Sequence, residues 1–218
     1  MKCLSFLPLL AATAHGAVQG FDISHYQASV NFPAAYSGGL RFVYIKATEG
    51  TTYQDPAFSS HYSGATSAGF IRGGYHFARP ASSTGAAQAS YFVAHGGGWS
   101  NDGKTLPGML DLEGDCAGLS TASMVSWISS FSNQYHSLTG RWPVIYTTNS
   151  WWSTCTGNSA AFNANSPLML ARWGSTAGTI PGGWPYYTIW QYKDSNTYGG
   201  DSDVFNGDAT QLKKLATG

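Results

Sequence analysis

Short runs of apolar and β-branched residues recur along the chain, separated by more polar segments. The runs lie at 18–23, 42–48, 71–78, 106–113, 143–148, 168–173 and 186–192. In several of them, such as 42–45, apolar residues occupy consecutive positions, which is typical of parallel strands buried on both faces. The pattern therefore predicts seven or eight strands of a buried parallel sheet.

Helix start and stop signals occupy segments between these strands. The predicted helices cover 57–69, 85–95, 121–138 and 209–216. Asp55 followed by Pro56 is the predicted start of the first, Ser83 or Thr84 caps the second, Ser120 the third and Asp208 the fourth. The helix over 121–138 has the clearest pattern, because its apolar residues recur at helical spacing and it ends before Gly140.

The alternation of strands and helices predicts an α/β fold with right-handed crossovers. Seven or eight strands in a chain of 218 residues favour a closed barrel over a doubly wound sheet. A G-x-G-x-x-G motif is missing after the first strand, which argues against dinucleotide binding. Helical segments end after Trp173, where 174–184 is rich in Gly, Pro, Ser and Thr. We therefore expect an irregular TIM-like (β/α) barrel with the last helices replaced by short connections.

Residues 1–17 have the pattern of a secretory signal peptide. Lys2 provides the positive start, residues 4–10 the apolar region, and Ala12 and Ala14 a small-residue cleavage site. The apolar region is too short to span a bilayer, and no other segment is long enough. We expect a secreted, extracellular protein without a membrane partner, whose residues 18–218 form one domain because no linker or repeat divides them.

Two cysteines, Cys116 and Cys155, remain once Cys3 leaves with the signal. In an oxidising compartment two cysteines most simply form one disulfide. A metal site would need further ligands near them, and none is evident. The sequence therefore predicts neither a metal nor another cofactor.

The composition bears on the kind of ligand. Charged residues make up 10% of the chain, the formal net charge is zero and no Lys/Arg cluster is present, which argues against nucleic acid or acidic lipid as a partner. Aromatic residues make up 15%. Most of them are expected to fill the core, but exposed rings also suit the C–H faces of sugars, so an uncharged carbohydrate is a natural ligand.

Polar residues recur where the predicted strands end, which is where a β/α barrel carries its functional residues. They are Asp22, Ser24, Lys46, Glu49, His76, Arg79, Asp111, Glu113, Tyr146, Arg172 and Gln191, with Asp201 and Asp203 near the last strand. Each also has a structural interpretation: Lys46 and Glu49 as a rim ion pair, His76 as a core histidine. Their shared position favours an acidic cleft.

The segment Asp111-Leu112-Glu113 is the most informative of these. Side chains two apart on a strand share a face, so both carboxyls should project from one strand end. Their repulsion should make one of them hold its proton to a higher pH. A proton-holding acid beside an ionised carboxylate is what cleavage of a glycosidic bond requires. The alternative is a solvated acidic turn, because Gly114 and Asp115 follow.

Six motifs in order carry a resemblance to a known family. They are Gly20-Phe21-Asp22-Ile23-Ser24, Ile45-Lys46-Ala47-Thr48-Glu49-Gly50, Gly74-Tyr75-His76-Phe77, Asp111-Leu112-Glu113, Trp190-Gln191-Tyr192 and Asp201-Ser202-Asp203-Val204-Phe205-Asn206-Gly207. Together they resemble family 25 of the glycoside hydrolases, the Chalaropsis-type lysozymes, over the whole mature chain. The single-domain length is similar to that of secreted fungal members, and we expect a monomer.

The resemblance implies hydrolysis of the β-1,4 bond between N-acetylmuramic acid and N-acetylglucosamine in bacterial peptidoglycan. Glu113 matches the family acid, Asp111 its partner and Asp22 the first-strand aspartate. Asp201 matches the late aspartate by its spacing to Phe205, and Asp203, at a position usually taken by Asn, is held in reserve. The expected substrate-binding residues are Lys46, Tyr75, His76, Phe77, Tyr146, Arg172, Trp190, Gln191 and Asp203.

The mechanism has several open forms. Asp111 and Glu113 share a strand, so Asp111 is expected to orient the substrate's 2-acetamido group for attack, while direct attack by Asp22 or Asp201, or attack by water with inversion, remains an alternative. Three other classes of protein compete: a chitin-cleaving barrel hydrolase, a non-catalytic barrel that binds cell-wall carbohydrate, and a disulfide-stapled structural protein.

Overall fold

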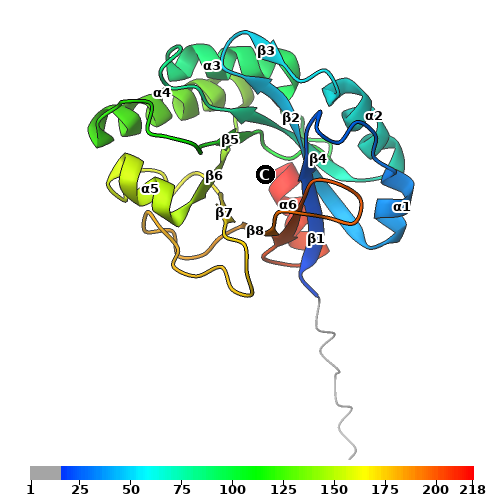
Figure 1. Ribbon diagram of the computed structural model, residues 1–218. Helices are drawn as coiled ribbons and strands as arrows, with labels where there is room; N and C mark the ends of the chain where they lie inside the picture. Colours follow the sequence, from blue (N-terminus) through cyan, green and yellow to red (C-terminus); the bar gives the residue numbers. More distant parts are fainter. Residues whose placement is uncertain (1–15) are drawn as a thin grey trace, which may run out of the picture.

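The computed structural model describes residues 16–218; most of the predicted signal segment lies outside the described residues. Eight strands close into a barrel with helices around it (Figure 1), because β1 pairs with both β2 and β9. They are β1 (Val18–Ile23), β2 (Leu40–Glu49), β4 (Ile71–Phe77), β5 (Met109–Asp111), β6 (Val144–Thr148), β7 (Leu168–Ala171), β8 (Ile189–Lys193) and β9 (Asp201–Phe205). Short β3 (Tyr53–Gln54) pairs with the end of β2. The predicted barrel is confirmed.

The sheet differs from the predicted parallel one at its last strand. β9 is antiparallel to both of its neighbours, β8 and β1. No helix intervenes between β8 and β9, so the chain turns back directly. The first residue of β9, Asp201, therefore lies beside Asp22 near the end of β1, at the end of the barrel where the parallel strands finish. We call this end the mouth.

The helices are α1 (Phe32–Ser37), α2 (Phe58–Ala68), α3 (Gly85–Phe92) followed by the π-helical turn η1 (Val93–Gly97), α4 (Thr121–Thr139), α5 (Asn149–Thr156) and α6 (Ala209–Thr217). The predicted caps Ser120, Thr84 and Asp208 are confirmed, each accepting a backbone N–H of its own helix. The N-cap of α2 is Ala57 and not the predicted Asp55, whose Oδ1 accepts the Ala57 backbone N–H at 2.9 Å while its Oδ2 lies 2.8 Å from His25 Nδ1. Short α1 and α5 were not predicted.

Helices cover only part of the barrel. Between β7 and β8 the chain forms loops and turns, as predicted for the irregular side (Figure 1). Helix α6 closes the end opposite the mouth, since its Leu212 and Ala216 pack with the interior residues Leu106 and Val144. No helix within residues 16–218 is long and apolar enough to cross a membrane.

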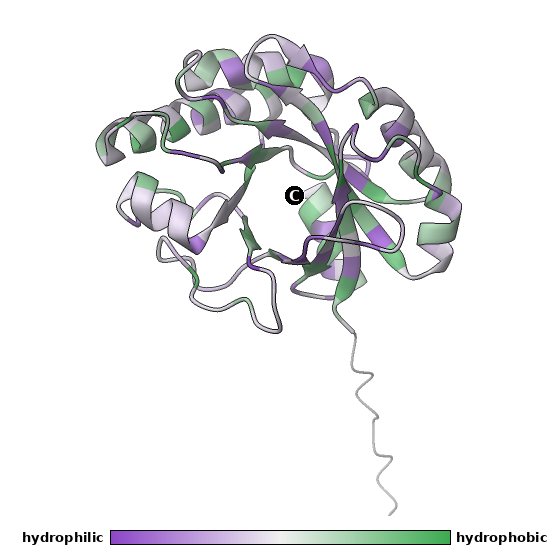
Figure 2. Cartoon of the chain, viewed as in Figure 1, coloured by the Kyte–Doolittle hydropathy of each residue, from purple (hydrophilic) through white to green (hydrophobic). Residues whose placement is uncertain are grey.

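Alternation along the strands separates the barrel interior from the layer beneath the helices. On β2, Phe42 and Tyr44 belong to the interior cluster, whereas Val43 and Ile45 pack in the cluster that includes α1 and α2. The hydropathy colours change accordingly along several strands (Figure 2). Towards the mouth the inward positions become polar, beginning with Lys46 on β2. The same alternation decides which side chains reach the site.

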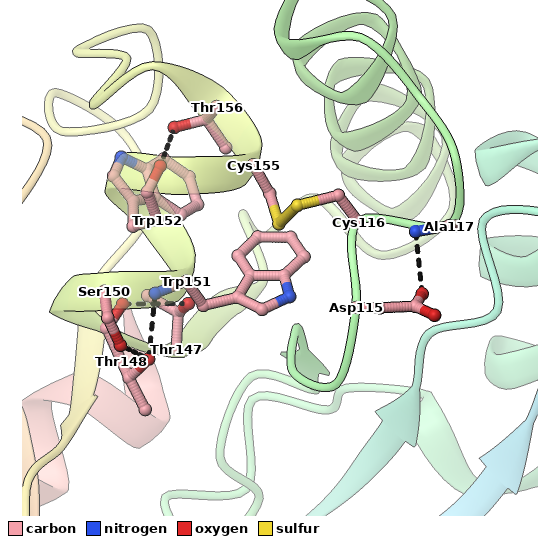
Figure 3. Close-up of a disulfide and its surroundings, with 10 residues drawn as sticks. All are labelled: Asp115, Cys116, Ala117, Thr147, Thr148, Ser150, Trp151, Trp152, Cys155 and Thr156. Atoms are coloured by element: carbon pink, nitrogen blue, oxygen red, sulfur yellow. Dashed lines mark hydrogen bonds between the residues drawn. A yellow bond between two sulfur atoms is a disulfide. The ribbon is translucent and has the colours of Figure 1, made fainter.

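A disulfide joins Cys116 to Cys155, with their Cα atoms 5.2 Å apart, and confirms the predicted pair (Figure 3). It links the loop after β5 to α5, and both segments follow neighbouring strands of the barrel. The indole of Trp151 lies beside the disulfide in Figure 3. The bond therefore ties the segment that follows Glu113 to a fixed helix.

The double variant Cys116→Ser/Cys155→Ser should lose about 4 kcal/mol of unfolding free energy, because the bond spans 39 positions and restricts the unfolded chain accordingly. Urea unfolding followed by tryptophan fluorescence measures the change. Ser153→Ala, an exposed change on the same helix, is the control and should leave the midpoint where it is. A double variant as stable as the parent would contradict this expectation.

Candidate active site

The two acids after β5 share the mouth. Asp111 is the last residue of β5, and Leu112 continues the sheet pattern by donating its backbone N–H to the Tyr146 carbonyl at 3.0 Å. Leu112 is fully buried in the cluster beneath the helices. Its neighbours on either side therefore point the opposite way, Asp111 into a buried position and Glu113 to the surface. The predicted common direction of the two carboxyls follows from this alternation.

Burial, Glu113 and Asp22 together raise the pKa of Asp111 well above its usual range. Burial also raises the pKa of Glu113, while Lys46 and Arg79 lower it. The direction for Glu113 agrees with the sequence prediction, but the cause differs, because the predicted cause is repulsion between Asp111 and Glu113, whereas burial is what raises the pKa. Both acids of the pair therefore hold a proton more readily than a free carboxyl does.

Two further acids come from β1 and β9. Asp22 and Asp201 are register partners, and Gln191 Nε2 donates to Oδ2 of each, at 2.8 and 3.2 Å. Burial and the charge of Asp201 raise the pKa of Asp22 to about 7, and Glu113 contributes to the rise. Burial, Asp194 and Glu113 raise the pKa of Asp201. Four carboxyls from three strands thus act on one another across the mouth.

A cationic group borders these acids. Lys46 Nζ lies 2.7 Å from Glu49 Oε2, and Arg79 Nη2 lies 2.6 Å from Glu49 Oε1. Both cations also lie over the Phe77 ring, 4.8 and 4.6 Å from its centroid. The predicted ion pair of Lys46 and Glu49 is therefore present, and the same lysine acts on both acids of the Asp111/Glu113 pair.

Glu113 lines two surface hollows. One, of about 540 Å³, is lined by Ala78, Arg79, Pro80, Ala81, Ser82, Glu113, Gly114, Asp115 and Ala117. The other, of about 510 Å³, is lined by Glu113, Gly114, Asp115, Cys116, Thr148, Ser150, Trp151, Thr154 and Cys155. The two hollows share Glu113, Gly114 and Asp115 in their linings.

Two predicted binding residues, Tyr75 and Tyr146, face the acids. Tyr146 donates its hydroxyl to Gln191 Oε1 at 3.0 Å. Burial raises the pKa of both tyrosines well above their usual range, and Asp22 and Asp111 add to the rise. With Lys46, Phe77 and Gln191 they form the inward-facing group of the predicted binding set.

His76 does not belong to that group. It is fully buried, and its ring packs against Phe92 and Phe131 beneath α3 and α4. Its nitrogens lie 2.7 Å from Thr48 Oγ1 and 2.9 Å from Gln88 Oε1. Burial lowers its pKa to about 4. The structural interpretation of His76 is correct, and the prediction of substrate contact is wrong because the ring lies on the outer face of β4.

Arg172 and Trp190 also lie on outward positions. Trp190 Nε1 donates to the Arg172 carbonyl at 2.8 Å, and the Arg172 guanidinium donates to Thr176 in the next loop. The structure therefore does not support either as a mouth residue. Trp173 is not among the predicted site residues; it is 61% exposed and donates its Nε1 to Gln191 Oε1 at 3.1 Å. Met169 on β7 faces the barrel interior, and if side chains keep alternating past the end of β7, Trp173 faces the same way.

Asp203 lies deeper than predicted. It is fully buried, and it is the register partner of Gly20, two residues further from the mouth than Asp22. A substrate at the mouth does not reach it, so its predicted role in substrate binding is wrong. Because β9 runs antiparallel, Asp201 is the acid of this strand that lies at the mouth.

Several known proteins are similar to this chain. A family model for glycosyl hydrolases family 25 matches residues 21–201. An N,O-diacetylmuramidase from Chalaropsis sp is 65% identical over 210 residues, covering 92% of this chain and 100% of that protein. Lysozyme M1 of Streptomyces globisporus is 51% identical, covering 91% and 71%. The structure of a family GH25 lysozyme from Aspergillus fumigatus has 58% identity and a TM-score of 0.92, covering 93% and 100%.

The family match runs from Phe21 to Asp201. It therefore contains the acid pair at the end of β5 and the paired aspartates of β1 and β9. The solved relative has the same fold over nearly its whole length. The chain belongs to glycosyl hydrolases family 25 and is a glycoside hydrolase.

Proposed function

We propose that this enzyme is a lysozyme (N-acetylmuramidase) that hydrolyses the β-1,4 bond between N-acetylmuramic acid and N-acetylglucosamine in bacterial peptidoglycan. The observation that carries the proposal is the Asp111/Glu113 pair at the mouth, with Glu113 lining two hollows. The names of two similar proteins, an N,O-diacetylmuramidase and a lysozyme, support the substrate. A glycan needs open space beside the acid, and Glu113 borders both hollows.

Glu113 is the general acid in this proposal. Part of its side chain lies at the surface, where a glycosidic oxygen can reach it, and partial burial raises its pKa so that it retains a proton to give. As the bond breaks, the proton goes to the leaving oxygen. The resulting carboxylate then takes a proton from the water that completes hydrolysis.

Asp111 orients the 2-acetamido group of the sugar. Its Oδ1 is buried and has no hydrogen-bond partner among the described residues, so it is available to the substrate's N–H. Held in this way, the acetamido oxygen attacks the anomeric carbon and forms a cyclic intermediate, which water opens with net retention. Asp22 and Asp201, when ionised, stabilise the positive charge that develops at that carbon.

Aromatic and polar side chains at the mouth bind the sugar rings. The exposed indole of Trp173 is held by its hydrogen bond to Gln191, so it can stack on a C–H face without first losing much conformational freedom. Lys46, Tyr75, Phe77, Tyr146 and Gln191 complete the proposed binding set. We further propose that the enzyme is a secreted monomer. The disulfide supports secretion, because such bonds persist in oxidising compartments.

Digestion of purified bacterial cell wall should release saccharides that carry N-acetylmuramic acid at the new reducing end, because the acid protonates the oxygen that leaves with N-acetylglucosamine. Mass spectrometry of borohydride-reduced products identifies that end. Chitin is the comparison substrate. Products ending in N-acetylglucosamine, or release from chitin alone, would favour the chitin-cleaving alternative, and binding without any product would favour a carbohydrate-binding barrel.

Glu113→Gln should reduce kcat by about 10²–10⁴-fold, the usual contribution of a general acid, because the amide has no proton of suitable acidity. Asp111→Asn should also be severely damaging while leaving the protein folded. Asp208→Asn is the matched control: it also removes one carboxylate, but Asn caps α6 as well as Asp and lies away from the mouth. Near-parental activity in Glu113→Gln would mean that another residue is the acid.

Activity should fall as pH rises through the pKa of Glu113, because the ionised acid has no proton to donate. Lys46 lowers that pKa, so Lys46→Met should move the alkaline limb of the kcat profile to higher pH. Arg79→Gln should move it less, and less again at high salt, because that cation is more exposed. A soluble, uncharged oligosaccharide is the substrate. If Lys46→Met shifted only the acid limb of the kcat profile, the alkaline limb would belong to a group other than Glu113.

A further inference from the structure

Asp203 is a buried acid that the proposed reaction does not use directly. It is fully buried, and neither of its carboxyl oxygens has a hydrogen-bond donor within residues 16–218. Two residues along the same strand, Asp201 reaches the mouth and receives Gln191. Asp203 instead occupies the next inward layer, between its register partners Gly20 on β1 and Gln191 on β8.

The charged and titratable groups around Asp203 are acids and phenols. Asp22 and Asp201 act on its carboxyl, and Asp203 in turn acts on Tyr44 and Tyr146. Among the ion pairs of the described residues, none includes Asp203. No cation therefore compensates a charge at this position.

The nearby donors are already committed to other acceptors. Tyr44 donates its hydroxyl to the Pro107 carbonyl at 2.9 Å, and Tyr146 donates to Gln191. The Gln191 amide donates to Asp22 and Asp201. An ionised Asp203 would have neither a cation nor a donor, and a buried carboxylate of that kind is strongly unfavourable.

A protonated carboxyl removes that difficulty and introduces one O–H donor. The acceptor within reach is Asp22, which lies two residues along β1 from Gly20, the register partner of Asp203, and so faces the same side of the sheet. A protonated Asp203 can therefore donate its O–H to the Asp22 carboxylate. Burial raises the pKa of Asp203 well above its usual range, and the charges of Asp22 and Asp201 raise it further. Such a hydrogen bond from Asp203 favours the ionised form of Asp22.

We propose that Asp203 is a positioning residue that stays protonated while the enzyme works and donates its O–H to the Asp22 carboxylate from beneath the mouth. Together with Gln191 it holds Asp22 in one orientation and favours its ionised form. Whether Asp203 is protonated does not depend on the proposed mechanism. Any effect of Asp203 on turnover, in contrast, rests on the proposed role of Asp22.

The protonation state is tested by a carboxyl ¹³C NMR titration of the aspartate-labelled wild-type protein. Asp22 should titrate near 7, the value reached by its pKa. Asp203 should keep the chemical shift of a protonated carboxyl when Asp22 has ionised. A carboxylate shift for Asp203 at a pH where Asp22 is still protonated would overturn the proposal. No variant is needed, and no activity is involved.

The hydrogen bond is tested by Asp203→Asn and Asp203→Val, two replacements of similar volume. Asn keeps a donor, so the Asp22 pKa, kcat and KM should stay close to the parental values. Val removes the donor, so the Asp22 pKa should rise by about 1 to 2 units, as expected from losing one hydrogen bond to a charged group. In Asp203→Val kcat should fall below neutral pH while KM changes little, and Asp208→Asn is again the control.

Other outcomes separate this proposal from the proposed function. If Asp203 carried a charge, both replacements would lower the Asp22 pKa, because each would remove a negative neighbour; that result overturns the proposal. An unchanged Asp22 pKa in Asp203→Val overturns it as well. A fully active Asp22→Asn enzyme would instead contradict the role of Asp22 in the reaction, while the NMR titration still decides whether Asp203 holds a proton.

Discussion

The pairing of β9 between β1 and β8 is the constraint on which the site depends. This antiparallel strand closes the barrel, and its register sets Asp201 beside Asp22 and Asp203 beside Gly20. The Gln191 amide then reaches both mouth aspartates from β8. A shift of one residue in this pairing would turn both aspartates of β9 outward and remove them from the barrel interior.

The charges of the mouth are graded from its rim to its interior. At the rim, Lys46 and Arg79 share Glu49 and lower the pKa of Glu113. Deeper in the barrel Asp22 and Asp203 have no cation partner, and burial raises their pKa values. The acid nearest solvent is thus the one with the most moderate environment, which suits a group that must both give and take a proton.

The irregular half of the barrel and the disulfide have related consequences. Between β7 and β8, where the chain has no helix, Trp173 lies at the surface and is hydrogen-bonded to Gln191. On the other side of the site, the Cys116–Cys155 bond ties the loop that follows Glu113 to α5 (Figure 3). The acid is therefore carried on a loop that is fixed at both ends, by β5 and by the disulfide.

The sequence by itself determined the barrel, its irregular last part, the helix over 121–138 with its caps, and the Asp111/Glu113 pair. These follow from local periodicity and capping, which depend on residues close in the chain. Only the tertiary structure decided the direction of β9, the depth of Asp203 and the faces of His76, Arg172 and Trp190. A strand end identifies a candidate position, but whether its side chain enters the barrel depends on register and on burial by distant segments. For the same reason the raised pKa of Glu113 has burial as its cause, which no spacing of acids along the chain reveals.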